Sequence, residues 1–402
     1  MKIVHVNMSC ASGGASIAAS RHAEAMRRCE ADARMLTLDD LLEGRGFRRT
    51  VYRVLRWLRF KMNGLYGVFG SFGFMRSGFS IERHPDIESA DIVYLHWVDD
   101  GLLSMRSLER LLATGKPVYW FMHDMFPFTG GCHYSMECSR YRDICRNCPL
   151  VKRRWLLDIV KRCFERKGRI YSMYPNLAFL APSHWLAECA ASSALCEGHA
   201  VSVCPNLIDT GLFLPGDKSS ARASFFEGGE DRKVILFSAE AIDNPYKGWP
   251  YLLECLSELD PSRYVCLVLG KSHHAVEFKD SPVMMVFTGY LSAPEDIIRA
   301  YRASDVFVTP SLADNFPNVL LEALSCGLPC VGFDSGGVSD LVLHMRTGYL
   351  ARRCDAKDLA GGIEWVLADD ARYLALCSES RNHAVGSYSY ERVKDYHKCL
   401  EP

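Results

Sequence analysis

The chain has 402 residues, of which 49% are hydrophobic and 24% charged, and this composition excludes a disordered chain. The length suits two or three domains with cores large enough to need no disulfide staples. The opening residues MKIVHVNMS contain no signal-peptide core, and no apolar run approaches about 18 residues. We therefore expect a cytoplasmic protein whose 17 cysteines are thiols or metal ligands.

The net charge of −1 hides an asymmetry between the two halves. Residues 1–205 contain 28 Lys and Arg against 20 Asp and Glu, whereas the remainder contains 19 against 28. A basic half joined to an acidic half indicates that the halves meet different partners. An anionic membrane, a nucleic acid or an anionic polymer would suit the basic half.

The first half predicts an α/β domain. Residues 2–8 predict a short apolar strand that runs through the small-residue loop around Gly13 and Gly14 into a helix ending near residue 28. Further buried strands are predicted at 91–95, 117–121 and 177–181. Continuous apolar strands alternating with helices favour a parallel sheet covered on both faces.

A second α/β series follows residue 206. Its predicted strands are 234–238, 264–269, 284–287, 306–309 and 329–333, separated by helices such as 249–259, 294–303 and 318–326. We predict a first domain at 1–205, a second at 206–386 and a helical carboxyl-terminal segment at 387–402. Two such sheets would present their loops to a ligand in a cleft.

Residues 47–79 interrupt the first domain with a basic amphipathic segment, in which arginines interleave with apolar and aromatic residues. Residues 48–61 suit a helix that lies in an anionic membrane interface. The alternative is an ordinary surface helix whose apolar side packs on the core, because amphipathicity alone does not distinguish the two. The second basic run at 152–169 favours the membrane, where each Lys or Arg contributes about 1 kcal/mol.

The most informative stretch is 304–350. A strand ends in the loop SLADNFP, which enters a helix that Gly327 closes as a left-handed cap. The amide groups at the start of this helix would favour a phosphate. Asp314 and Glu322, eight residues apart, would offer acceptor-only carboxylates to sugar hydroxyls beside that phosphate. Glu322 lies among apolar residues, where an acid needs a partner or a ligand.

This stretch resembles the Glu-x7-Glu signature of the retaining GT-B glycosyltransferases, with Asp314 in place of the first Glu. The matching residues are Pro310, Ser311, Asp314, Phe316, Leu321, Glu322, Ala323, Cys326, Gly327 and Pro329. The SGGAS loop, the His123–Asp124 pair, APSHW at 181–185, PNLID at 205–209 and Lys247 in YKGW are also similar to the family. The segment around residues 95–149 resembles a subgroup that assembles surface polysaccharides.

The resemblance implies the GT-B fold, with two Rossmann-like domains of parallel strands facing a central cleft. The first domain would bind the acceptor and the second the donor, and residues 387–402 would cross back to the first domain. The reaction implied is retaining, metal-independent transfer of a hexosyl group from a UDP- or GDP-sugar to a glycan or lipid-linked glycan. The catalytic residues implied are His123, Asp314 and Lys247, and the donor-binding residues are Gly13, Gly14, Lys247, Asp314, Asn315, Phe316, Pro317, Asn318, Val319 and Glu322.

Transfer from such a donor requires stabilisation of a departing diphosphate, which Lys247 and backbone amides can supply without a metal.

Three rival classes of protein stay open. An epimerase acting on nucleotide sugars would use the same cleft and turn over donor without acceptor. A dehydrogenase would need the G-x-G-x-x-G spacing, which the loop at Gly13 lacks. A nucleic-acid-binding protein is disfavoured by the near-neutral net charge of the chain. For His96, we favour a structural role in core packing over a role in the site.

Four cysteines, Cys132, Cys138, Cys145 and Cys148, fall within 17 residues with the spacing C-x5-C-x6-C-x2-C. Four thiolates would form a closed, structural zinc site. Disulfides, or four unlinked thiols, are the alternatives. The other 13 cysteines are scattered and suit small apolar positions.

Overall fold

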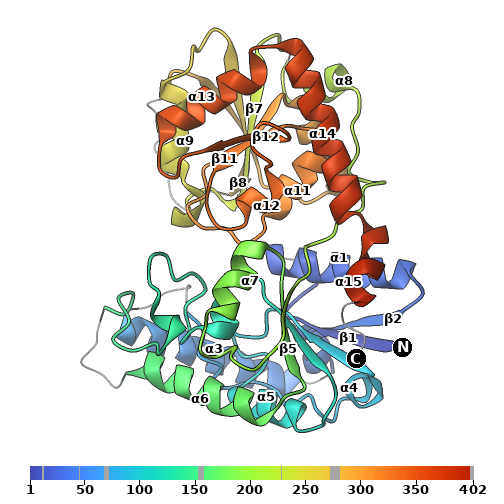
Figure 1. Ribbon diagram of the computed structural model, residues 1–402, viewed down its shortest axis with the longest axis vertical. Coiled ribbons are helices and arrows are strands. Elements are labelled where there is room, and N and C mark those ends of the chain that lie inside the picture. Colours follow the sequence, from blue (N-terminus) through green and yellow to red (C-terminus); the bar gives the residue numbers. More distant parts are fainter. Residues whose placement is uncertain are drawn as a thin grey trace. The chain divides into compact units, whose positions relative to one another are not determined.

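The computed structural model describes residues 1–10, 13–44, 46–67, 72–152, 158–227, 229–271 and 281–398. The chain forms two compact units. The first comprises Met1–Pro205 and the residues from Tyr396 onward, and the second comprises Asn206–Asp395. Each unit holds its own six-stranded parallel sheet (Figure 1).

The sheet of the first unit has the strand order β2-β1-β3-β4-β5-β6. Its strand β3 is buried along its whole length, as expected for a central strand with helices on both faces. The strands are β1 Lys2–Val6, β2 Asp32–Leu36, β3 Ile92–Leu95, β4 Val118–Phe121, β5 Leu177–Ala181 and β6 Val201–Val203. The helices are α1 Gly14–Arg28, α2 Leu38–Leu42, α3 Gly46–Tyr66, α4 Pro85–Ser89, α5 Met105–Leu112, α6 Ile159–Met173 and α7 His184–Ala191.

The sheet of the second unit has the order β12-β11-β10-β7-β8-β9. Alternate residues of β7 enter two separate cores, Val234 and Leu236 on one face and Ile235 and Phe237 on the other. The strands are β7 Lys233–Ala241, β8 Tyr264–Lys271, β9 Met284–Gly289, β10 Val306–Thr309, β11 Cys330–Phe333 and β12 Gly348–Ala351. The helices are α8 Lys218–Arg222, α9 Trp249–Ser257, α10 Pro294–Ala303, α11 Asn318–Ser325, α12 Val338–Leu341, α13 Ala356–Leu367, α14 Asp370–Tyr388 and α15 Val393–Lys398.

The predicted fold class, two Rossmann-like α/β units with parallel sheets, is confirmed. Strands β2, β6 and β12 are not among the strands predicted from the sequence. All three are edge strands with partly exposed residues, so they lack the continuous apolar run that marks a buried strand.

The strand order of each sheet reverses at one place. In the first unit the reversal lies between β1 and β3, and in the second it lies between β7 and β10. In open parallel sheets, ligands bind beyond the carboxyl ends of the strands at such a reversal. The loops that follow these four strands are therefore the places where binding residues are expected.

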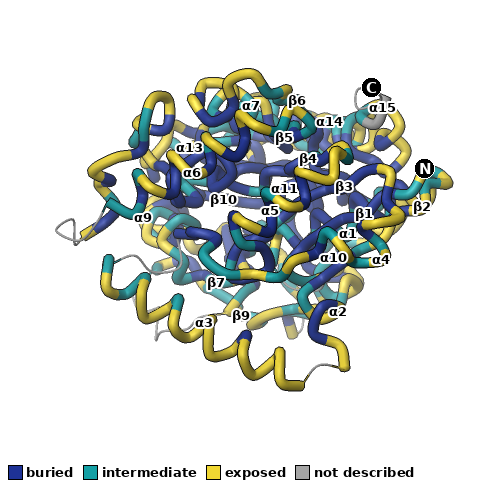
Figure 2. Tube along the Cα trace, turned by 90° about the horizontal axis from the view of Figure 1, so that it is seen from below, coloured by how far each residue is buried: buried dark blue, intermediate teal, exposed yellow. Residues whose placement is uncertain are grey.

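Helix α3 contains the basic segment, and most of its residues are exposed (Figure 2). Tyr52 is its one buried residue among those described. Phe47, Trp57 and Phe60 are 83%, 57% and 61% exposed. The expectation of a surface helix packed on the core through its apolar side therefore does not describe α3.

The predicted helical segment at 387–402 is interrupted. Helix α14 ends at Tyr388, whose carbonyl accepts a hydrogen bond from the amide of Ile208. The chain then passes through extended Ser389 and a short 3-10 turn, Tyr390–Arg392, into α15. Residues 399–402 lie outside the described part of the chain.

Candidate active site

In the second unit, Lys247 and Asp314 meet at the point where the strand order reverses. Lys247 follows β7 and Asp314 follows β10, the two strands that flank the reversal. The Lys247 ammonium donates to the Asp314 carboxylate, with 2.6 Å between Nζ and Oδ2, and both side chains are mostly buried. The sequence motifs indicate both residues as site residues but give no reason for the two side chains to touch.

Two close backbone approaches hold these loops together. The Leu312 amide donates to the Tyr246 carbonyl at 2.8 Å, which docks the turn carrying Lys247 on the loop carrying Asp314. Gly248 has φ +70°, and a Cβ there would lie 1.9 Å from the Pro310 carbonyl oxygen. Only glycine permits this approach without a shift of the backbone.

Helix α11 begins directly after the Asp314 loop. The Asn206 side chain donates to the Phe316 carbonyl and to the Asn318 side chain, each at 3.2 Å, which fixes the entry to the helix. Pro317 is the N-cap, so Asn318 and Val319 begin the first turn beside Asn315 and Asp314. The predicted left-handed cap is confirmed, because Gly327 has φ +72° and the Leu328 amide donates to the Ala323 carbonyl.

Glu322 lies inside α11 and is 6% exposed. Its Oε2 accepts a hydrogen bond of 2.8 Å from the hydroxyl of Tyr301, which comes from α10. A carboxylate offers about four acceptor positions, so this hydrogen bond leaves capacity for further donors. The acid among apolar residues therefore has at least one protein partner.

In the first unit, Gly13 forms the turn between β1 and α1. Its φ of +86° and ψ of 152° are accessible to glycine and costly for other residues. Gly14 is the first residue of α1. The buried side chain of Asn7 ties this turn to the loop after β3, because it accepts from the Trp97 amide and donates to the Ser16 hydroxyl.

His123 ends a chain of hydrogen-bonded imidazoles. His5 Nδ1 lies 2.9 Å from His96 Nε2, and His96 Nδ1 lies 2.9 Å from His123 Nε2. Burial lowers the pKa of His123 to about 4, and burial beside other imidazoles holds the pKa of His96 well below its usual value. At neutral pH His123 is therefore a neutral group whose tautomer is coupled to that of His96.

A second histidine, His133, is held by Asp124, with 2.6 Å between Nδ1 and Oδ2. Burial raises the pKa of Asp124, but the charge and hydrogen bond of His133 outweigh burial and leave it below its usual value. For His133, burial lowers the pKa, and Asp124 more than restores it. Neither His133 nor His5 is among the site residues predicted from the sequence. For His5, its position in a largely apolar strand is a signal in the sequence that a polar side chain is buried there.

The four clustered cysteines line one cavity of about 10 Å³, together with Tyr141 and Val160. No cysteine in the described ranges forms a disulfide. Among the described residues, no three His, Cys, Asp or Glu side chains are placed to hold a metal ion. Burial raises the pKa of Cys132 to about 12 and that of Cys145 to about 11. In this arrangement those two cysteines are protonated at neutral pH.

Comparisons with known proteins agree with this geometry. Residues 232–369, which contain Lys247, Asp314 and Glu322, match the family model of glycosyl transferases group 1. A D-inositol 3-phosphate glycosyltransferase of Rhodococcus opacus is 29% identical over 201 residues, covering 46% of this chain and 44% of the relative. A GDP-mannose-dependent alpha-mannosyltransferase of Corynebacterium glutamicum is 29% identical over 190 residues, covering 47% and 42%. The chain thus spans less than half the length of these curated relatives.

Among solved structures, the Anabaena protein HepE in complex with UDP and glucose matches with a TM-score of 0.62. The match covers 100% of this chain and 99% of HepE at 16% sequence identity, so it bears on the fold alone. The match to the model of glycosyl transferases group 1 lies within the second unit, and the chain as a whole has the GT-B fold.

Proposed function

We propose that the chain is a retaining, metal-independent glycosyltransferase that moves a hexosyl group from a UDP- or GDP-sugar to a glycan or lipid-linked glycan of the cell surface. The observation that carries the proposal is the Lys247–Asp314 pair beside the start of α11, at the reversal of strand order in a domain of the group 1 family. HepE was solved with UDP, and the mannosyltransferase depends on GDP-mannose, which supports a nucleoside-diphosphate sugar as donor.

The roles of the donor-binding residues follow from their contacts. The Lys247 ammonium has three N–H donors and donates one hydrogen bond to Asp314, so the other two are available to the leaving diphosphate. The amides at the start of α11 would add positive potential at the same place. Asp314 and Glu322 would accept hydrogen bonds from the hydroxyls of the sugar and the ribose.

His123 and the Gly13–Gly14 turn of the first unit are also proposed to bind the donor, and the first unit is proposed to bind the acceptor. Because the pKa of His123 is about 4, its role would be that of a neutral hydrogen-bonding group. A retaining front-face reaction needs no protein side chain as general base, since a phosphate oxygen of the donor takes the proton of the acceptor as the bond to the sugar breaks.

The decisive experiment is a thermal-shift screen of the full chain against UDP, GDP and their sugars. A ligand held at 100 times its Kd stabilises the fold by about 2.7 kcal/mol, which shifts Tm by several degrees. We expect one diphosphate to stabilise the wild type and Lys247→Ala to lose the shift.

The matched control is Lys218→Ala. Lys218 pairs with Asp305 at 2.8 Å, just before β10, and so lies at the opposite edge of the same sheet. This variant should keep the nucleotide-induced shift. If no nucleotide shifts the Tm of the wild type, the proposal is overturned. Turnover of the donor without an acceptor would indicate an epimerase instead.

Contact with an anionic membrane is proposed for α3. The support is its exposed apolar residues interleaved with arginines. No helix in the described part of the chain is long and apolar enough to cross a membrane. Replacing Val54, Trp57 and Leu58 together by serine should release the protein from phosphatidylglycerol liposomes; unchanged sedimentation would refute the contact.

A structural zinc ion at the four cysteines is a separate proposal. It is supported by their shared cavity and by the Gly130 amide, which donates to Cys145 Sγ at 3.3 Å as amides do to metal-bound thiolates. The described thiols would have to move closer together and lose protons to bind it. Metal analysis of the purified protein should find one zinc per chain, lost when Cys145 and Cys148 are both changed to serine; a metal-free, folded wild type would refute it.

A further inference from the structure

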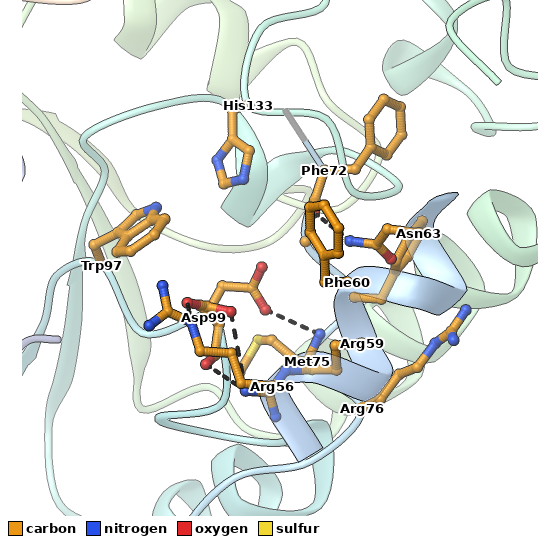
Figure 3. A pocket seen from close by; sticks show the side chains of 13 residues that line it. Arg56, Arg59, Phe60, Asn63, Phe72, Met75, Arg76, Trp97, Asp99 and His133 are labelled. Atoms are coloured by element: carbon orange, nitrogen blue, oxygen red, sulfur yellow. Dashed lines mark hydrogen bonds and ion pairs between the residues drawn. The ribbon is translucent and has the colours of Figure 1, made fainter. Parts of the chain in front are cut away.

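The first unit contains a cavity of about 270 Å³ that none of the roles above uses. Its walls come from helix α3, from residues 72–76, from the loop after β3 and from His133 (Figure 3). The loop after β3 places the cavity at the carboxyl edge of the sheet, beside the reversal between β1 and β3. The volume is just below that of sites for drug-sized ligands and suits a single ring.

The cavity has aromatic walls. Trp97 is partly exposed and Phe60 on α3 is 61% exposed, while Phe72 is buried. Trp97, Phe60 and Phe72 all line the cavity (Figure 3). An aromatic face pairs with the apolar C–H face of a sugar ring as it does with other apolar groups.

Two polar side chains on the cavity wall are buried in a fixed geometry. Asp99 and His133 are each 8% exposed. The Met75 amide donates to Asp99 Oδ1 at 3.2 Å, and Asp124 orients the His133 ring. A Cβ at Gly73 would lie 1.8 Å from Asp99 Oδ2, so only glycine leaves room for this carboxylate. Such preformed polar groups fix the orientation of a ligand.

Three arginines line the cavity, and each already contacts other groups of the chain; the Arg76 guanidinium lies over the rings of Phe74 and Tyr66. Arg56 pairs with Asp100 at 3.0 Å, and Arg59 donates to the Asp100 carbonyl and to Ser77, each at 2.7 Å. An anion would also face the Asp99 carboxylate. Burial raises the pKa of Asp99 against the opposing effect of His133, which indicates that burying any further charge is costly there.

We propose that this cavity binds one neutral pyranose ring of the acceptor. The ring packs against Trp97 and Phe60, and its hydroxyls bond to Asp99, His133 and Asn63. The inference rests on the proposed glycosyltransferase function and names the class of group that the first unit recognises. Asn63 donates weakly to the Phe72 carbonyl at 3.5 Å, so its amide is readily redirected to a hydroxyl.

The test uses the full chain without nucleotide, and saturation-transfer NMR with the methyl glycosides of glucose, galactose, mannose and N-acetylglucosamine. At least one glycoside should bind the wild type. Phe60→Ala and Asn63→Ala should each weaken that binding two- to tenfold, as expected for one packing or hydrogen-bonding contact. Both residues lie on the exposed helix α3, so neither change removes core packing.

Trp57→Ala is the matched control, because Trp57 is an exposed aromatic residue of the same helix that does not line the cavity. It should leave glycoside binding unchanged. The inference is overturned if no glycoside binds, if Trp57→Ala weakens binding as much as Phe60→Ala, or if inorganic phosphate competes with the glycoside. Nucleotide binding in the second unit is measured separately by thermal shift, so failure of this inference is distinguishable from failure of the proposed function.

Discussion

The low pKa of His123 predicts a specific loss of stability in acid. The pKa lies at about 4 in the folded chain, against 6.5 for an unperturbed histidine. Between these values the unfolded chain binds a proton at this position and the folded chain does not, so stability falls as the pH falls. The stability contributed by this difference is fully present above pH 6.5 and is lost progressively down to pH 4.

The magnitude follows from the two pKa values. Proton uptake by the unfolded chain costs about 1.4 kcal/mol of stability at pH 5.5 and about 2.5 kcal/mol at pH 4.5. His123→Gln removes the titrating group and retains an amide that can hydrogen-bond to His96 Nδ1. On acidification from pH 7 to pH 4.5, the variant should therefore lose about 2.5 kcal/mol less than the wild type.

Urea unfolding followed by tryptophan fluorescence measures this loss, because five of the seven tryptophans belong to the first unit. The matched control is His184→Gln, which removes an exposed histidine of the same unit and leaves the buried chain of imidazoles in place. It should lose stability on acidification as the wild type does. Equal acid sensitivity of His123→Gln and the wild type would show that His123 is protonated as readily in the folded chain as in the unfolded one, and would refute the reasoning.

Three further predictions concern residues in or beside the proposed donor site. Gly248→Ala should weaken nucleotide binding in the thermal-shift assay, because its Cβ would collide with the Pro310 carbonyl and displace Lys247; wild-type binding would contradict that account. Gly13→Ala should cost about 1–2 kcal/mol in urea unfolding through backbone strain alone, since no atom of the described residues lies within 4 Å of the added Cβ, and a larger loss would point to a steric clash. Tyr301→Phe should destabilise the chain by about 1–3 kcal/mol by removing one donor to Glu322, and Glu322→Gln, which retains an acceptor, should cost less. The reverse order would show that the Tyr301 hydroxyl is not the main hydrogen-bond donor to Glu322.

The sequence by itself determined the fold class and most of the buried strands. Strands β5 and β10 match their predicted bounds because continuous apolar runs and flanking turns are local signals. The cap at Gly327 and the start of α11 were likewise predicted, since they depend on residues next to each other in the chain. The edge strands were missed because partial exposure breaks the apolar run.

Only the tertiary structure decided which side chains meet. Lys247 and Asp314 are 67 residues apart, and His5 and His96 are 91 apart, so no spacing along the chain reveals their contacts. The order of the strands brings them together, because parallel strands place their carboxyl ends at one edge of the sheet. Burial is likewise a property of the packed chain: it gives His123 its low pKa and leaves the apolar side of α3 exposed.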